Sequence, residues 1–196
     1  MIPNSIEPDQ EINAFDNCSW RSSLEVDAQK QIADLRILIV DDNWFARSLL
    51  RNVLQALGIW KLVECPYPKE GLKRLQEEHF DLVLTDNHMP KMSGVEFTRQ
   101  IRAGDRVKYP AIPIVMISSL TELGNVNKAA DAGIHEFLAK PFTADGLVKK
   151  ILSSINTPRQ FIRSTTYVGP CRRRQKLVLK SRGKDRRMRS AGHLAA

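Results

Sequence analysis

Four short apolar segments of the chain each end at a polar residue, and this repeated pattern constrains the fold more than any other feature. The first three of these segments along the chain are rich in isoleucine, leucine and valine, which is typical of a strand buried on both faces of a parallel sheet. Stretches with apolar residues at helical spacing separate the segments, so strands and helices alternate along the chain. The segments are 36–40, 82–84, 112–117 and 136–139, and the polar residues that follow them are Asp41 and Asp42, Asp86, Ser118 and Lys140.

With a short fifth segment, Leu62 to Glu64, strands and helices alternate five times. This alternation predicts an α/β fold with a doubly wound parallel sheet, right-handed crossovers and flavodoxin-like (βα)5 topology. The simplest strand order is 2-1-3-4-5. The expected strands are 36–41, 62–64, 81–86, 112–118 and 135–139, and the expected helices are 43–57, 68–78, 95–102, 121–132 and a last one that follows the N-cap Thr143 and ends near 155.

The first expected helix has a clear apolar stripe. Its spacing predicts that one face of the helix packs on the sheet. Gly58 is a suitable residue to end this helix, because glycine readily adopts the conformation that follows a helix C-terminus. The side chains expected to point inward are those of Phe45, Leu49, Leu50, Val53, Leu54 and Leu57.

In this strand order the four polar strand ends meet at the carboxyl edge of the sheet, where open α/β sheets bind ligands. Clustered carboxylates repel each other unless a cation lies among them. Mg²⁺ prefers oxygen ligands, and an ammonium and a hydroxyl group can hold phosphoryl oxygens. Taken singly, an aspartate after a strand is more often a helix cap, and an Asp-Asp pair is usually a solvated turn. Together, the four strand ends predict a site that receives a phosphoryl group on a carboxylate.

The spacing of these residues resembles that of the bacterial response-regulator receiver domain, of the chemotaxis type. The resemblance covers about residues 36–155, and its motifs are specific as a set. The matching features are Asp41-Asp42, Asp86-x-x-Met89-Pro90-x-Met92-x-Gly94, Ser118 and Lys140-Pro141-Phe142.

The resemblance implies a role for each of the acidic residues. Asp86 would be the phosphoacceptor. Asp42, together with Asp41 and Asp86, would bind Mg²⁺, with the backbone carbonyl of His88 as a further ligand. The only chemistry implied is magnesium-dependent self-phosphorylation and dephosphorylation at Asp86, so the chain is not expected to be an enzyme that acts on another substrate.

The resemblance also implies a switch. Ser118 and Lys140 would hold the phosphoryl oxygens, and the Lys140-Pro141 bond would be cis so that it aims the lysine at the site. Phe137 would turn inward with Ser118 and change the face made by the fourth helix, the fifth strand and the fifth helix. The alternative for Phe137 is a plain core aromatic.

The charge of the chain is unevenly distributed, which divides it into three parts. Residues 1–35 carry a net charge of −5, residues 36–157 carry +2 and residues 158–196 carry +11. The first part is expected to be a mostly disordered acidic lead, although Trp20 could dock on the core. The second is the expected receiver domain and the third a mostly disordered basic tail.

These features lead to three hypotheses for the output. The 39 residues after Thr157 are too few for a helix-turn-helix output domain, so the first hypothesis is a stand-alone receiver. It takes phosphate from a histidine kinase or phosphotransfer protein and signals to a protein partner. In the second, the basic tail binds nucleic acid or an anionic membrane. In the third, Asp86 is a phosphate sink that drains a kinase.

The sequence favours the cytoplasm as the location of the protein. Cys18, Cys65 and Cys171 are odd in number and far apart, which is typical neither of a disulfide framework nor of a metal site. No apolar run reaches the roughly 18 residues of a membrane helix, and the first 30 residues show no secretory signal.

Overall fold

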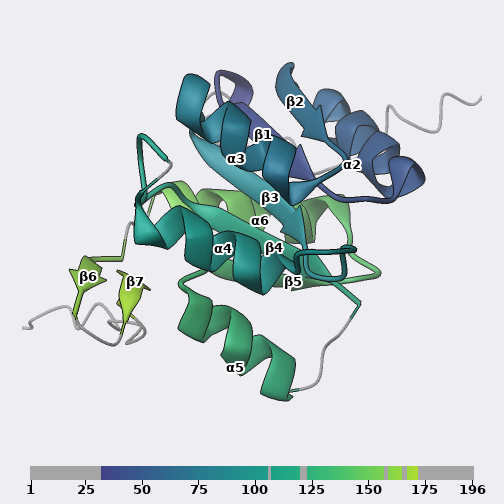
Figure 1. Ribbon diagram of the computed structural model, residues 1–196. Coiled ribbons are helices and arrows are strands. Elements are labelled where there is room, and N and C mark those ends of the chain that lie inside the picture. Colours follow the sequence, from purple (N-terminus) through teal and green to yellow (C-terminus); the bar gives the residue numbers. More distant parts are fainter. Residues whose placement is uncertain (1–31, 106, 120–122, 157–158, 165–166, 172–196) are drawn as a thin grey trace, which may run out of the picture.

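The computed structural model describes residues 32–105, 107–119, 123–156, 159–164 and 167–171. Its centre is a five-stranded parallel sheet in the order β2-β1-β3-β4-β5, which confirms the predicted order. Helices cover both faces of the sheet (Figure 1). The strands of this sheet are β1 (Arg36–Val40), β2 (Lys61–Cys65), β3 (Leu82–Asp86), β4 (Ile114–Ser118) and β5 (Glu136–Ala139), and the helices are α2 (Trp44–Ala56), α3 (Pro68–Glu77), α4 (Gly94–Ala103), α5 (Leu123–Ala132) and α6 (Ala144–Asn156).

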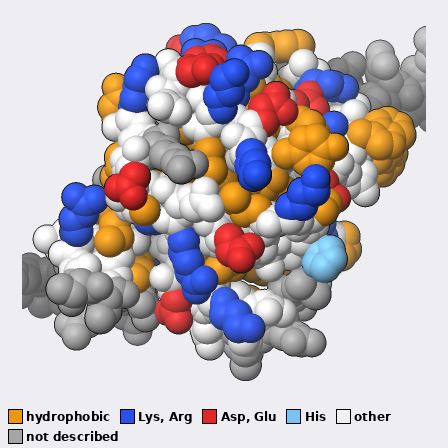
Figure 2. Space-filling view, viewed as in Figure 1, with side chains coloured by type: hydrophobic (Ala, Val, Ile, Leu, Met, Phe, Trp, Pro, Cys, Tyr) orange, Lys and Arg blue, Asp and Glu red, His pale blue; other side chains and the backbone are white. Residues whose placement is uncertain are grey.

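Two apolar clusters, one on each face of the sheet, hold these layers together. The cluster between the sheet and helices α3, α4 and α5 includes Leu72, Phe97 and Ala129. The cluster on the other face, under α2 and α6, includes Leu54 and Leu147. On the face that carries α3, α4 and α5, acidic and basic side chains are interspersed with apolar ones at the surface (Figure 2).

Polar side chains cap the first turns of α2 and α6. Asn43 Oδ1 accepts hydrogen bonds from the backbone N–H groups of Phe45 (2.9 Å) and Ala46 (3.3 Å) and so caps α2. Thr143 Oγ1 accepts a hydrogen bond from the backbone N–H of Gly146 (3.1 Å), which confirms it as the predicted N-cap of α6. Both caps satisfy N–H groups that have no partner within the helix.

The prediction that the whole apolar stripe of α2 points inward is wrong for its first two members. Phe45 is 62% exposed and Leu49 is 47% exposed. The core covers Leu50 and Leu54, farther along the helix. Near Phe45 and Leu49, the connection from β5 to α6 leaves a groove instead of filling the space.

The described structure extends beyond the predicted bounds of the receiver domain at both ends. Ile32 and Leu35, expected in the acidic lead, are buried in the same cluster as α2 and α6. Within the predicted disordered tail, β6 (Phe161–Arg163) and β7 (Val168–Pro170) form an antiparallel hairpin in which Ile162 pairs with Gly169. Residues 1–31, including Trp20, and residues 172–196 lie outside the described part of the chain, so the predictions made for them stay predictions.

Arg102 of α4 explains why the hairpin docks. This buried side chain donates from Nε to the carbonyl of Gly133 (2.9 Å) and from Nη1 to the carbonyl of Pro110. Its guanidinium lies 5.6 Å from the centroid of the Phe161 ring. A Cβ atom on Gly133 would lie 2.8 Å from the carbonyl oxygen of Val168, so the glycine lets the hairpin approach the α5–β5 connection.

Candidate functional site

Asp41, Asp86 and Lys140 meet at the carboxyl edge of the sheet. Asp41 follows β1, Asp86 is the last residue of β3, and both carboxylates are buried. Lys140 directly follows β5. Its Nζ atom lies 2.8 Å from Asp86 Oδ1 and 3.1 Å from Asp41 Oδ2. One ammonium group therefore bridges two carboxylates that come from neighbouring strands.

Backbone N–H groups hold the other oxygen of each carboxylate. Asp41 Oδ1 accepts a hydrogen bond from the N–H of Asn43 (2.9 Å), and Asp86 Oδ2 accepts one from the N–H of His88. These contacts come from the loops that directly follow β1 and β3. They fix the orientation of both carboxylates at the edge of the sheet.

Burial and charge act against each other in this site. Burial raises the pKa of Asp41, and the Asn43 amide and the Lys140 ammonium offset only part of that increase. For Lys140, burial acts to lower the pKa, but the hydrogen bonds and charges of Asp86 and Asp41 outweigh it, so the pKa is raised. The lysine is therefore charged at neutral pH, and it compensates the repulsion between the carboxylates.

The third predicted carboxylate, that of Asp42, is exposed and is not brought into this ion pair. Among the described residues, no group of three or more His, Cys, Asp or Glu side chains could hold a metal ion. The reason is local, because adjacent residues in a turn direct their side chains differently. Arg47 fixes this turn by donating from Nη1 to the carbonyls of Asp41 (2.7 Å) and Asp42 (3.1 Å).

The donors at this edge nevertheless suit Mg²⁺, which takes one or two carboxylates and completes its shell with carbonyl oxygens and water. Two buried carboxylates already need a cation between them, and Lys140 supplies one. Asp42 adjoins them in sequence and is accessible to solvent. The residues present therefore fit the metal, with fewer preformed side-chain ligands than the sequence suggests.

Ser118 and Phe137 lie where the sequence places them. Ser118 ends β4 and is buried, and its carbonyl accepts a hydrogen bond from the backbone N–H of Lys140 (2.9 Å). Phe137 is half-buried and packs against the cluster under α3, α4 and α5. This packing accounts for a core aromatic, and the proposed switch role of Phe137 stays a prediction.

Two features of the predicted motif have direct structural explanations. A Cβ atom at Gly94 would lie 2.2 Å from the carbonyl oxygen of Asp86, so only glycine allows α4 to begin this close to the site. The Lys140-Pro141 peptide bond is cis, as expected. Sequence reasoning missed Arg47, although a basic residue one turn into the helix after an Asp-Asp pair is within reach of that turn.

Two chemotaxis proteins are similar to this chain in sequence. The chain is 35% identical over 117 residues to the chemotaxis protein CheY of Pseudomonas aeruginosa, an alignment that covers 60% of this chain and 93% of that protein. It is 35% identical over 118 residues to chemotaxis protein CheY-3 of Vibrio cholerae, covering 60% of this chain and 89% of that one.

Solved structures show the same fold. Chemotaxis protein CheY4 of Vibrio cholerae is 28% identical, with a TM-score of 0.54, and the match covers 60% of this chain and 96% of that chain. The receiver domain of sensor histidine kinase PA1611 from Pseudomonas aeruginosa is 24% identical, with a TM-score of 0.56. The match covers 62% of this chain and 98% of that chain, and that structure is described with a magnesium ion coordinated in its active site cleft.

The described part of the chain contains no helix that is long and apolar enough to cross a membrane. The model of the response regulator receiver domain family matches residues 37–152, which include both carboxylates of the ion pair and the lysine that bridges them. This match spans more than half of the chain, and the chain belongs to the response regulator receiver domain family.

Proposed function

We propose that the chain accepts a phosphoryl group on Asp86 from a phosphohistidine of a histidine kinase or phosphotransfer protein. An Asp86 carboxylate oxygen attacks phosphorus as the bond from phosphorus to the imidazole nitrogen breaks, and that nitrogen keeps the electron pair. The observation that carries this proposal is the position of Lys140 Nζ, 2.8 Å from Asp86 and 3.1 Å from Asp41. An ammonium held there can transfer its hydrogen bond from a carboxylate to an incoming phosphoryl oxygen.

The neighbouring residues position the reacting groups. The N–H of His88 holds one oxygen of Asp86, which fixes the plane of the carboxylate. Ser118 ends the adjacent strand β4, and in this proposal its hydroxyl donates to a phosphoryl oxygen. Asp41, Asp42, Asp86 and the carbonyl of His88 are the groups that would hold Mg²⁺. When bound, the ion neutralises charge on the transferring phosphoryl group.

The output that we propose is a change of the face formed by α5, β5 and α6, read by a protein partner. Ser118 ends β4, before α5, and Lys140 lies between β5 and α6. A phosphoryl group that binds both side chains therefore acts on the segments that precede α5 and α6. The described residues of α5 bury only small alanine side chains, Ala129 and Ala132. A helix with few buried apolar contacts is suited to shifting. The proposal places the chain in the cytoplasm, with the donor kinase.

The test is to incubate the full chain with Mg²⁺ and acetyl phosphate and to measure its intact mass, beside Asp86→Asn as the matched control. The expected result is a labile gain of one phosphoryl group in the parent and none in Asp86→Asn. The rate of its loss then distinguishes a lasting signal from a phosphate sink. The proposal fails if neither protein gains mass while a known receiver in the same mixture does.

A basic tail that binds nucleic acid or an anionic membrane is the alternative output. Residues 172–196 carry a net charge of +9 and follow the hairpin directly. Binding through phosphate groups should weaken steeply with salt and be lost when these residues are removed. Phosphorylation-dependent protein binding that survives this removal would leave the first proposal as the output.

A further inference from the structure

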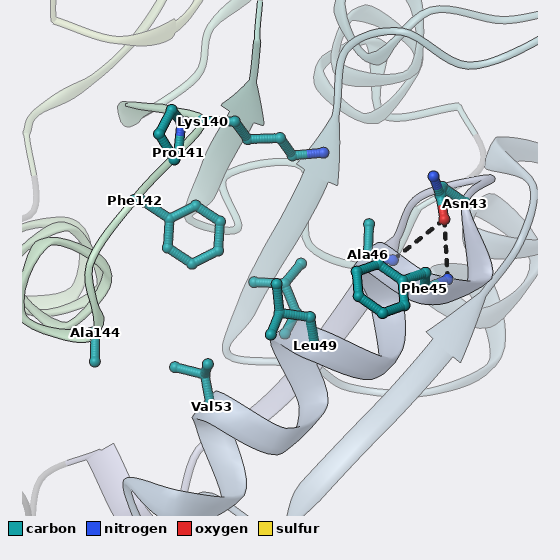
Figure 3. Close-up of a pocket in the computed structure, with 10 residues that line it drawn as sticks. Asn43, Phe45, Ala46, Leu49, Val53, Lys140, Pro141, Phe142 and Ala144 are labelled. Carbon is teal, nitrogen blue, oxygen red and sulfur yellow. Dashed lines mark hydrogen bonds between the residues drawn. The ribbon is translucent and has the colours of Figure 1, made fainter.

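An apolar groove runs between the first turns of α2 and the connection from β5 to α6. Its volume is about 380 Å³, within the roughly 300–1,000 Å³ range of small-molecule sites. Phe45, Leu49 and Val53 line it from α2, and Phe142 faces them from the other side (Figure 3). Lys140, the residue that bridges the two carboxylates, lines the same groove. The groove therefore adjoins the phosphoacceptor site.

Two large apolar side chains that line the groove from α2 are exposed to solvent. Phe45 and Leu49 belong to the apolar stripe of α2, and yet both are among the large exposed apolar side chains of the molecule. Covering apolar surface of this kind is favourable, by roughly 25 cal/mol for each Å² removed from water. The α2 side of the groove is thus a surface that gains stability when it is covered.

The described structure begins at Ile32, in the layer that α2 and α6 form on the sheet, at the end of that layer opposite the groove. Ile32, the first described residue, is buried, and so is Leu35. Both pack in the cluster formed by α2 and α6, the two helices that flank the groove. Ile32, the point at which the 31 preceding residues join the described structure, therefore lies in the layer of these helices. The members of this cluster that come from the two helices include Leu50 and Leu54 of α2 and Leu147 and Ile151 of α6.

The lead is long enough to reach the groove and carries suitable side chains. Trp20 lies twelve residues before Ile32, which even a helix would span over about 18 Å, close to the roughly 20 Å length of α2. The large apolar residues between positions 12 and 26 are Ile12, Phe15, Trp20, Leu24 and Val26.

We propose that residues 12–26 of this chain dock in the groove, with Trp20 packed against the exposed α2 surface around Leu49. The interaction is intramolecular, so the lead is present at a high effective concentration. Because the groove extends to Lys140, the docked lead also covers one side of the approach to Asp86. This consequence, competition with a phosphodonor, rests on the proposed function, whereas the docking itself does not.

The test measures how well Trp20 is shielded from solvent in the full chain. Trp44→Phe and Trp60→Phe leave Trp20 as the only tryptophan, and its fluorescence is then quenched with acrylamide. We expect quenching severalfold weaker than that of free tryptophan. Adding Leu49→Arg places a charge in the groove and should raise the quenching to the level of free tryptophan. Asn52→Arg, at an exposed position of the same helix, is the matched control and should leave Trp20 shielded.

Circular dichroism and urea unfolding confirm that each variant is folded, which is expected because Leu49 is already half-exposed. The proposal is overturned if acrylamide quenches Trp20 in the single-tryptophan protein as strongly as it quenches free tryptophan, or if the quenching is the same with and without Leu49→Arg. Shielding that disappears on dilution would assign the groove to a second copy and also overturn it. None of these readouts requires phosphorylation, so their failure is separate from a failure of the proposed function.

Discussion

The two ends of the parallel sheet each hold a cationic side chain, half-buried at one end and fully buried at the other, and the two cations have opposite kinds of partner. At the carboxyl end, Lys140 bridges the carboxylates of Asp41 and Asp86. At the amino end, the acceptors described for Arg102 are uncharged: the carbonyls of Gly133 and Pro110, and Nδ1 of His135 at 3.4 Å. Burial lowers the pKa of Arg102 to about 9.

The difference separates a site that can exchange partners from one that cannot. The side chain of Lys140 is 28% exposed and pairs with two charges, so a phosphoryl oxygen can replace one of them without stranding the other. Arg102 is enclosed, and the buried carbonyl of Gly133 would lose this donor if the guanidinium moved away. We infer that the carboxyl end performs chemistry and that the amino end fixes the fold.

Lys140→Met tests the first half of this comparison and has the largest expected effect. Loss of a charge that stabilises the transferring phosphoryl group should lower the initial rate of phosphorylation by about 10²- to 10³-fold. The rate is measured by intact mass with Mg²⁺ and acetyl phosphate. Lys149→Met, at an exposed position of α6, is the control and should keep the parental rate. Equal rates in both variants would show that the bridge is not part of the chemistry.

Arg102→Met tests the second half. The substitution removes the donor to the carbonyls of Gly133 and Pro110, at a cost of about 1–3 kcal/mol each, so the free energy of unfolding should fall by about 2 kcal/mol or more. His135 Nδ1 keeps the hydrogen bond from the backbone N–H of Ile114 (3.2 Å). Urea unfolding measures it. Arg99→Met, at an exposed position of the same helix, should change stability little. A phosphorylation rate that falls in the folded Arg102→Met protein would contradict the separation of the two ends.

The carboxyl end was the more predictable of the two. Strand ends are marked locally in sequence, so Asp86, Ser118 and Lys140 could be placed from apolar runs and one strand order. The different exposures of Asp41 and Asp42 could not, because adjacent residues of one turn carry no signal for which of them turns inward.

The amino end was missed because its contacts join distant parts of the chain. Arginine is seldom fully buried, and the hairpin reads as a polar, basic segment with little apolar periodicity. Its docking depends on Arg102 and Gly133, which lie in other elements. The exposure of Phe45 and Leu49 was missed for a related reason, since a helical stripe does not show how far the neighbouring layer extends.

The pH dependence of stability should reveal His135 at the amino end. Burial lowers its pKa to about 3, and the charges of Arg102 and Arg159 add to the effect. The unfolded chain therefore binds more protons between the ordinary histidine pKa of about 6.5 and that value, so His135 contributes stability above pH 6.5 that is lost as pH falls toward 3. The loss from this group between pH 7 and pH 5 should be about 2 kcal/mol.

Urea unfolding at several pH values measures this dependence. His135→Gln should flatten the fall in stability between pH 7 and pH 5, whereas His79→Gln, at an exposed position, should not. If His135→Gln and the parent lose stability in parallel, His135 is protonated in the folded protein at pH 5. The acceptors around Arg102 are then not all uncharged.

Phe161→Leu gives the smallest effect and decides whether the hairpin belongs to the Arg102 cluster. The substitution keeps an apolar side chain but removes the ring that lies 5.6 Å from the guanidinium. A cation–π contact of this kind is worth about 0.5–1 kcal/mol, which should be the loss in the free energy of unfolding. Phe161→Tyr keeps the ring and should lose less. The loss from Phe161→Leu should also vanish in an Arg102→Met background, because no guanidinium is left for the ring to contact. An undiminished loss there would mean that the hairpin is held by apolar packing alone, and that Arg102 serves only the connections that precede β4 and β5.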